Sequence, residues 1–327
     1  MTIAASFEQS FGYGFFTTSI VRHLISVNVD VQLVPLFGHH VPPDLVPFCV
    51  KSQPKNIDLI IVSMPQLPSA PKAKALFTMW EASAVPPCYA PDLKKFKHII
   101  TPTEWSAAAF RPHHPRNIHF CPLGVNMKWS PPVLSPFTFT VVAADHMAPE
   151  RKRVQDIVDT FSETFKSESD VRLLIKRNPE CRPLRTFDNR VEIIKDRVPR
   201  NVYDALIART TVGVQLCAAE GWSLPVNEFM AAGKPVICPL AGSIGDYVSP
   251  KAVFPIGYTM RKSPPSVYLG VGKVPHADTR DLAAQMRFCY ENPFEVVRRG
   301  VQAFETSQKY TAHAMGANFL KLWQSLS

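Results

Sequence analysis

Two acidic residues eight positions apart, Glu220 and Glu228, are the side chains of this sequence best placed to bind a hydroxyl-rich ligand. Carboxylates accept hydrogen bonds, so they suit the hydroxyl groups of a ribose or a hexose. Both flank the predicted start of a short helix, where free backbone N–H groups and the helix dipole attract phosphate. A phosphate with a hydroxyl-bearing group on either side is the outline of a nucleotide sugar.

The elements around this pair are predicted to be a strand, a turn, a helix and a second strand. Residues 212–216 form a β-branched run typical of a buried strand, and residues 234–237 open the next one. Between them, Pro225 falls in the first helical turn and Gly233 stands where a left-handed residue ends a helix. Such a unit directs the helix N-terminus to the carboxyl edge of the sheet, where open α/β sheets bind ligands.

The whole stretch from 218 to 237 resembles the donor-site signature of GT-B retaining glycosyltransferases of the GT4-like class. The resemblance is carried by Glu220 and Glu228 together with Gly221, Leu224-Pro225 and Ala232-Gly233-Lys234-Pro235-Val236-Ile237. In that family the first Glu contacts the donor sugar and the second contacts the nucleotide ribose. Backbone amides at the turn hold the diphosphate, which the resemblance maps to the residues Gly221, Trp222, Ser223 and Leu224. This chain has Trp222-Ser223 where the family often has Phe-Gly.

The resemblance implies an α/β fold of the GT-B type, with two Rossmann-like doubly wound domains facing a central cleft. A chain of 327 residues is long enough for two domains with separate cores. We expect an acceptor-side domain over residues 1–134 and a nucleotide-sugar domain over 135–305. The last helix, 306–327, should cross back to brace the first domain, and the Pro-rich segment 130–136 should be the hinge.

Three consecutive basic residues follow the predicted first strand of the second domain. The resemblance places Lys152 at the family lysine that clamps the donor diphosphate, whereas the usual arginine five residues earlier is Met147 here. Arg151 or Arg153 is therefore expected to substitute for that arginine. A cation is needed because negative charge develops on the leaving diphosphate during transfer. The alternative is a solvated helix start.

Four further positions are candidates with plain alternatives. Lys176 ends a predicted strand on the cleft side and is a second phosphate candidate, unless it is an ordinary surface lysine. The resemblance places the nucleobase against the main chain near Val198, and Gly14 in a glycine-bearing turn that approaches the donor phosphates or the acceptor. It also places a catalytic or acceptor-side group near Glu81, at the end of another predicted strand. Gly14 is equally explained by a tight turn, and Glu81 by a solvated strand end.

Composition limits the remaining possibilities. There is no run of eighteen apolar residues and no signal-peptide layout, so we expect a cytoplasmic protein without a transmembrane segment. The cytoplasm of an infected host cell is one option. The seven cysteines are scattered, without metal-ligand spacing, which favours reduced thiols and no metal site. No cofactor is expected beyond the nucleotide sugar, which acts as a co-substrate.

The net charge of +9 suggests an anionic partner, with solubility as the alternative. Basic residues gather at two predicted loop–helix junctions: Lys94, Lys95, Lys97, Arg111 and Arg116. Such a surface attracts a polyanion, and the chain is similar in size and basicity to small phage-type glycosyltransferases that modify DNA bases. We therefore expect glucose transfer from UDP-glucose to a hydroxymethylated pyrimidine in DNA, with Trp105 or Phe110 assisting base extrusion. The alternatives are an envelope lipid or polysaccharide glycosyltransferase, and a catalytically idle GT-B module that binds nucleic acid.

Overall fold

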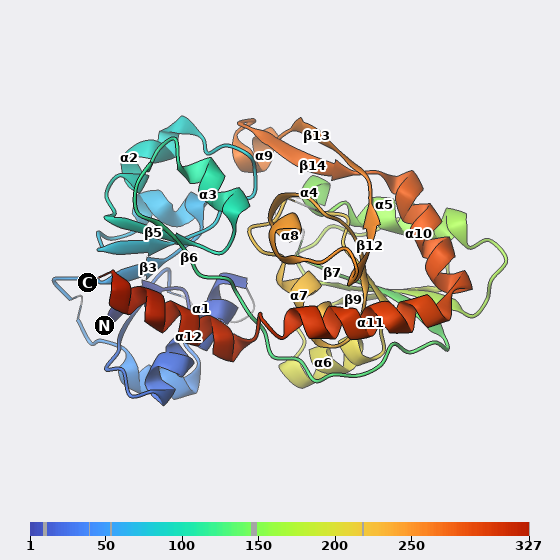
Figure 1. The fold of residues 1–327 in the computed structure, drawn as a ribbon, viewed down its shortest axis with the longest axis horizontal. Coiled ribbons are helices and arrows are strands. Elements are labelled where there is room, and N and C mark those ends of the chain that lie inside the picture. Colours follow the sequence, from blue (N-terminus) through green and yellow to red (C-terminus); the bar gives the residue numbers. More distant parts are fainter. Residues whose placement is uncertain (9–11, 39, 53, 145–148, 218, 327) are drawn as a thin grey trace. The chain divides into compact units, whose positions relative to one another are not determined.

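The computed structural model describes residues 1–8, 12–38, 40–52, 54–144, 149–217 and 219–326. The chain divides into two compact units (Figure 1). Unit 1 comprises Met1–Val125 and Lys309–Ser327, and unit 2 comprises Asn126–Gln308. The chain passes between the units at 125/126 and 308/309, whereas the sequence led us to expect boundaries at 134/135 and 305/306. Unit 1 therefore contains both ends of the sequence.

Unit 1 is built on a six-stranded parallel sheet with the strand order β2-β1-β3-β4-β5-β6. The strands are short and apolar, as expected where helices cover both faces of a parallel sheet. Their bounds are β1 Thr2–Ala5, β2 Gln32–Pro35, β3 Leu59–Ile61, β4 Ala75–Phe77, β5 His98–Thr101 and β6 Ile118–Phe120. The strand order reverses between β1 and β3, which makes that edge the switch point of this sheet.

The last helix of the chain packs on the first one within unit 1. Helix α12 contacts α1, and Phe319 of α12 is fully buried. Gly316 faces His23 so closely that a Cβ atom would lie 2.3 Å from its ring. The helices of unit 1 are α1 Gly12–Ser26, α2 Ala90–Leu93, α3 Glu104–Phe110 and α12 Ala312–Ser325, with 3₁₀ turns η1 Pro43–Phe48, η2 Met64–Ser69 and η3 Pro87–Tyr89. The residues after 308 thus belong to unit 1 through the packing of α12 on α1.

Unit 2 contains a second six-stranded parallel sheet, in the order β12-β11-β10-β7-β8-β9. Numbered from β7, this is the order 3-2-1-4-5-6 of dinucleotide-binding folds, and it reverses between β7 and β10. The bounds are β7 Phe137–Ala143, β8 Val171–Arg177, β9 Val191–Lys195, β10 Val212–Val214, β11 Val236–Pro239 and β12 Val253–Ile256. The loops after β7 and β10 consequently meet at the switch point.

An antiparallel hairpin, β13 Tyr258–Lys262 and β14 Lys273–Ala277, lies outside the main sheet and was not anticipated from the sequence. Its two strands are joined through the short helix α9, Pro265–Tyr268. The other helices of unit 2 are α4 Pro149–Lys152, α5 Val154–Thr164, α6 Arg200–Ala208, α7 Leu224–Ala231, α8 Gly242–Tyr247, α10 Thr279–Glu291 and α11 Pro293–Ser307.

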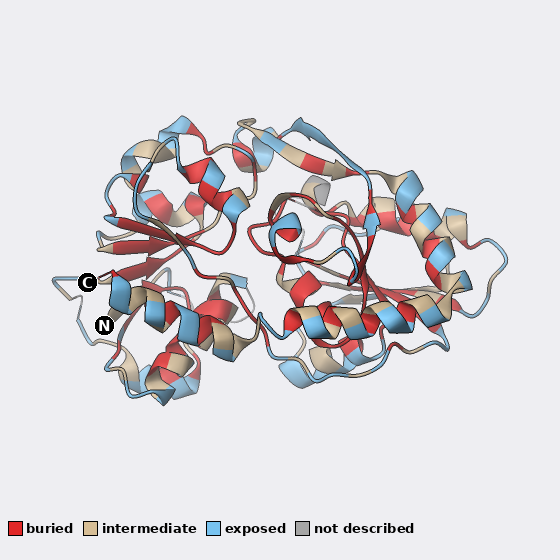
Figure 2. Ribbon diagram, viewed as in Figure 1, coloured by how far each residue is buried: buried red, intermediate tan, exposed pale blue. Residues whose placement is uncertain are grey.

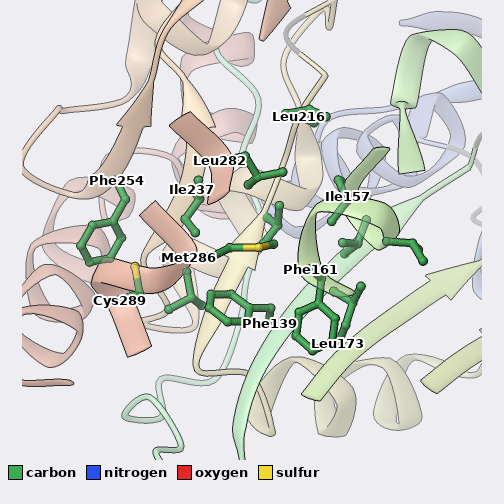
Figure 3. Packing of buried hydrophobic residues seen from close by; sticks show 14 of the residues in the cluster. Phe139, Ile157, Phe161, Leu173, Leu216, Ile237, Phe254, Leu282, Met286 and Cys289 are labelled. Carbon is green, nitrogen blue, oxygen red and sulfur yellow. The ribbon is translucent and has the colours of Figure 1, made fainter. Parts of the chain in front are cut away.

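A continuous apolar core fixes the sheet of unit 2 against its helices. Phe139 and Leu173 on the strands pack with Phe161 of α5 and with Leu282 and Met286 of α10 (Figure 3). The inner strands of both sheets are buried, whereas the edge strands β6 and β9 are partly exposed, and the helices expose residues on their outer faces (Figure 2). The strand ends that carry the candidate site therefore rest on a tightly packed platform.

The Pro-rich segment expected to be a hinge is fastened to unit 2. The N–H of Ser130 donates to the carbonyl of Ala232, and the ammonium of Lys234 donates to the carbonyl of Pro131 at 2.6 Å. Gly233 has the predicted left-handed φ of 79°, and its Cα packs against the indole of Trp129. This segment therefore belongs to the body of unit 2.

Two further observations bear on the expectations from composition. None of the helices in the described ranges is long and apolar enough to cross a membrane. All seven cysteines are free thiols, and five of them are buried.

Candidate active site

Glu220 meets two of the three consecutive basic residues at the switch point of unit 2. The Lys152 ammonium forms an ion pair with Oε1 of Glu220. Arg151 donates from Nη1 to the carbonyl of Ala219 at 2.9 Å and lies 3.5 Å from Oε2 of Glu220. Only 9% of the Lys152 and Glu220 side chains is exposed, so this pair lies in a largely water-excluded setting.

The rest of the turn after β10 fixes Glu220 further. Nε2 of Gln215 donates to its carboxylate at 2.9 Å, and the hydroxyl of Ser243 donates to its backbone carbonyl at 2.5 Å. Burial alone would raise the pKa of Glu220, but the charges of Lys152 and Arg151 outweigh burial and hold that pKa below its usual value. The structure thus supplies a fixed, ionised carboxylate.

Glu228, the fifth residue of α7, has a different environment. Arg200 donates to its Oε1 at 3.1 Å, and the Tyr203 hydroxyl donates to its Oε2 at 2.5 Å. Burial raises the pKa of Glu228, and Arg200 and Tyr203 offset this only in part. Both partners come from the first turns of α6. Sequence reasoning missed them because no local spacing links them to a residue more than twenty positions later.

The turn that leads into α7 is held in an uncommon conformation. Ser223 has a φ of 71° in the left-handed region and precedes the helix, but its side chain makes no capping hydrogen bond. Buried Trp222 stacks on Tyr247 with ring centroids 4.0 Å apart, and the Tyr247 hydroxyl donates to the Ser223 carbonyl. The Ser223 side chain therefore does not occupy the backbone N–H groups that begin α7 at Leu224. An anion can bind at a helix N-terminus only where such N–H groups are not capped by a side chain.

The predicted helix features are confirmed here. Pro225 lies in the first turn of α7, and Gly233 follows its end with positive φ. Gly221 is buried between Glu220 and Trp222 in the same turn. The structure therefore gathers Glu220, Glu228 and the turn residues at one strand–helix junction.

The remaining predicted residues of unit 2 divide between two places. Lys176, one residue before the end of β8, is half-buried. Burial lowers its pKa, which the charge of Glu228 partly opposes, so the lysine lies on the Glu228 side. Val198 is half-buried between β9 and α6. Arg153 instead has a left-handed φ of 52° and donates to Asp156 and to the carbonyl of Ala277. The position of Met147 lies outside the described residues.

Two predicted residues, Gly14 and Glu81, belong to unit 1. A Cβ atom on Gly14 would lie 2.0 Å from the carbonyl oxygen of Glu8, so close backbone packing alone requires glycine here. Glu81 lies four residues beyond the end of β4, which is shorter than predicted, and its carbonyl accepts a hydrogen bond from the Trp105 indole. Its charge also contributes to the raised pKa of the half-buried Tyr13, which burial of its hydroxyl causes in the main.

The five basic residues proposed to attract DNA are all exposed on unit 1, beside α2 and α3. Two of them already have acidic partners. Lys95 pairs with Asp92, and Arg111 forms a two-pronged ion pair with Glu104, the first residue of α3. Thr103 caps that helix by accepting a hydrogen bond from the N–H of Ser106. Across the residues that the structure describes, no group of three or more His, Cys, Asp or Glu side chains could hold a metal ion.

Comparison with known structures decides the fold. The chain is similar over its full length to sucrose-phosphate synthase from Thermosynechococcus elongatus, with a TM-score of 0.70, 13% identity and 99% of that chain covered. It is also similar over its full length to WaaG, a glycosyltransferase involved in lipopolysaccharide biosynthesis, with a TM-score of 0.68, 13% identity and 100% of that chain covered. The fold is GT-B.

A third GT-B structure resembles a smaller part of the chain. The pneumococcal O-GlcNAc transferase GtfA, solved with UDP and GlcNAc, matches 82% of this chain and 57% of its own, with a TM-score of 0.57 and 13% identity. No protein-family model matches the sequence, and no curated protein does. The two Rossmann-like domains predicted for a GT-B protein are thereby confirmed, each built on a parallel six-stranded sheet, at sequence identities that show the fold alone.

Proposed function

We propose that this protein is a retaining glycosyltransferase that moves a hexose from a nucleotide sugar to a hydroxyl acceptor. The observation that carries the proposal is the buried contact of Glu220 with Lys152 and Arg151, at the sheet's switch point and beside the uncapped start of α7. Ligands of open α/β sheets bind at such a point. The chain's likeness to several glycosyltransferases of GT-B fold supports the proposal.

The geometry suggests how each group would act. The donor diphosphate would lie on the N–H groups that begin α7, with Lys152 and Arg151 balancing the charge that develops on it. Glu220 would accept hydrogen bonds from the sugar hydroxyls, and Glu228 from the ribose. The bond from the sugar C1 to the diphosphate breaks, a bond to the acceptor oxygen forms on the same face, and the acceptor proton passes to a phosphate oxygen. No metal takes part in this scheme.

The other predicted residues would extend the site. Lys176 lies on the Glu228 side and would face the nucleotide, with the main chain near Val198 against the base. For the donor we propose UDP-glucose, which is supported by the similarity to a transferase solved with UDP. Gly14 and Glu81 of unit 1 are proposed to serve the acceptor side.

For the acceptor we propose a hydroxymethylated pyrimidine in DNA, supported by the net charge of +9. Lys94, Lys97 and Arg116 have no ion pair within the described ranges, so they are available to phosphate groups. An acceptor of the bacterial envelope is equally consistent with the likeness to WaaG. The idle-module alternative has less support, because an idle protein has no need of a buried carboxylate held between two cations.

A thermal-shift screen of nucleotide sugars tests the donor half. The matching donor should raise the melting temperature of the wild type by mass action. It should raise that of Glu192→Gln, a surface control, by the same amount. Glu228→Gln and Glu220→Gln should lose most of their shift relative to their own ligand-free proteins. If no nucleotide sugar stabilises the wild type, or if the two variants respond fully, the donor site is wrong.

Transfer of labelled sugar tests the acceptor half. Incorporation into hydroxymethylated DNA, and not into unmodified DNA, is the expected result. Incorporation only into lipid or glycan extracts would replace the DNA acceptor with an envelope one and leave the donor site standing.

A further inference from the structure

A pocket of unit 2 lies at the base of the β13–β14 hairpin, where the hairpin meets the start of α10. Its volume is about 500 Å³, within the range of small-ligand sites. The residues that line it and carry the argument are Arg153, Arg261, His276, Asp278 and Arg280. Neither Glu220 nor Glu228 lines this pocket.

Arg153 is built into the wall of the pocket. Its left-handed backbone, with φ of 52°, separates it from Lys152, and its side chain is only 11% exposed. Nη1 donates to the carbonyl of Ala277 at 2.6 Å, and Nε donates to Asp156 at 2.7 Å. These bonds hold the guanidinium in one orientation, so it is presented to a ligand without loss of side-chain freedom.

Arg261 lies on β13, whereas His276 and Ala277 lie on β14, the other strand of the hairpin. Arg261 is exposed and has no ion pair in the part of the chain that the structure describes. Its charge and that of Arg153 both reach His276. Burial lowers the pKa of His276, both arginines lower it further, and Asp156 acts in the opposite direction. The pocket therefore has a positive potential that a bound anion would relieve.

The start of α10 contributes charged side chains to the pocket, while Asp278 already caps the backbone N–H of Arg280. The side chains of Asp278 and Arg280 also form an ion pair of 2.8 Å. Three arginines against one aspartate leave the lining with a net charge of +2. Guanidinium groups from three separate positions match the several oxygens of a phosphate better than the two oxygens of a carboxylate.

We propose that this pocket binds the phosphate group of a small phosphate ester, at a site separate from the diphosphate site beside α7. The inference does not rest on the proposed sugar transfer, because none of the side chains that line the pocket has a role in that transfer. The hairpin does touch the loop that leads to Glu220, through a β-bridge between His276 and Cys217. Arg261 is the side chain most available to the ligand, and Arg153 is the fixed one.

Hydrogen–deuterium exchange of the full chain locates the ligand. Glycerol phosphate and inorganic phosphate should slow exchange in segments 257–263 and 272–281, and glycerol should not. The protection should persist in Lys152→Ala, which disables the proposed diphosphate site. Protection confined to segment 219–228, or equal protection by glycerol, would overturn the inference.

Variants then assign the binding to the arginines. Arg261→Ala should weaken glycerol phosphate binding roughly tenfold or more, and Arg261→Glu should abolish it, because one charge-assisted contact of this kind is lost and then reversed. Arg209→Ala, a solvent-exposed arginine of the same unit, should bind as the wild type does. Unchanged affinity in Arg261→Glu contradicts the proposal, as does binding of duplex DNA without any binding of the small esters. Donor binding measured on the same variants shows separately whether the sugar-transfer proposal stands.

Discussion

Glu220 and Glu228 are both buried acids, but their surroundings shift the two pKa values in opposite directions. Two cations keep the pKa of Glu220 below its usual value, whereas burial raises that of Glu228 above it. A buried ion pair is strongly coupled, because removing one partner leaves the other charge without compensation. Because the pKa of Glu228 is raised, its carboxylate takes up a proton before that of Glu220 as the pH falls.

A double-mutant cycle tests the Glu220–Lys152 pair. Glu220→Gln alone and Lys152→Met alone should each destabilise the protein, and the double variant should be less destabilised than the sum, with a coupling energy of about 1–3 kcal/mol. Urea unfolding of the four proteins gives this energy. The exposed Arg209–Glu192 pair, carried through the same cycle, should give only about 0–1 kcal/mol. Equal coupling energies in the two pairs would mean that burial does not strengthen the interaction between Glu220 and Lys152.

Donor affinity should depend on pH through Glu228. Its pKa is raised in the folded protein, so lowering the pH protonates this carboxylate before an ordinary one and removes an acceptor of ribose hydrogen bonds. We expect the donor dissociation constant to rise as the pH falls from neutral towards 5. Titration calorimetry of Glu228→Gln should show weak binding with a flatter pH profile. Parallel profiles in the two proteins would assign the dependence to another group.

At the scale of elements, α7 is positioned at both of its ends. The stacked Trp222–Tyr247 pair supports the turn before it, and after it the buried ammonium of Lys234 donates to the carbonyls of Pro131 and Ala208. Burial lowers the pKa of Lys234 to about 8. Lys234 therefore links the end of α7 to the segment before β7 and to the end of α6. Its burial makes the charged form of the ammonium less favourable than in water.

Lys234 should give the wild type a distinct stability profile in alkaline solution. Between pH 8 and the ordinary lysine pKa of 10.5, the unfolded chain keeps a proton that the folded protein has released. By linkage, this residue's contribution to the free energy of unfolding therefore rises with pH through that window. Denaturant unfolding of wild type and Lys234→Met should show the difference between them growing in favour of the wild type from pH 8 to 10. If the difference in unfolding free energy stays constant over this pH range, the pKa of Lys234 is not lowered in the folded protein.

Local patterns predicted the strand–turn–helix–strand unit well, because Pro225 and Gly233 each mark a helix end by their own backbone preference. The partners of Glu228 could not be found in this way, since Arg200 and Tyr203 arrive from another helix through the tertiary fold. The run of three cations predicted a phosphate clamp, but no spacing rule shows that a left-handed Arg153 turns away from Lys152 towards the hairpin. The hairpin itself carries mixed residues without a clear period, and its strands were not anticipated.

At the scale of the whole molecule, the two units differ in continuity. Unit 2 is one unbroken segment whose core residues all come from Asn126–Gln308, whereas unit 1 needs Lys309–Ser327 to cover α1. All donor-site residues proposed above belong to unit 2, whereas Gly14 and Glu81, proposed for the acceptor side, belong to unit 1. Folding and donor binding should therefore be separable from sugar transfer.

Expressed alone, residues 126–308 should fold cooperatively and bind the nucleotide sugar with an affinity within about tenfold of the full chain. The fragment should transfer no sugar, because the acceptor-side groups are missing. Circular dichroism, calorimetry and a transfer assay check these points, with the Glu228→Gln fragment as a folded control of weak binding. A folded fragment without donor affinity would place essential donor contacts in unit 1.

The most direct measurement for the central claim is a crystal structure of the chain with its nucleotide sugar bound. The account predicts the diphosphate on the N–H groups at the start of α7, the sugar hydroxyls on Glu220 and the ribose on Glu228, with Lys152 within hydrogen-bond distance of a phosphate oxygen. A nucleotide sugar bound elsewhere, with Glu220 and Glu228 both making only the contacts described above, would contradict it.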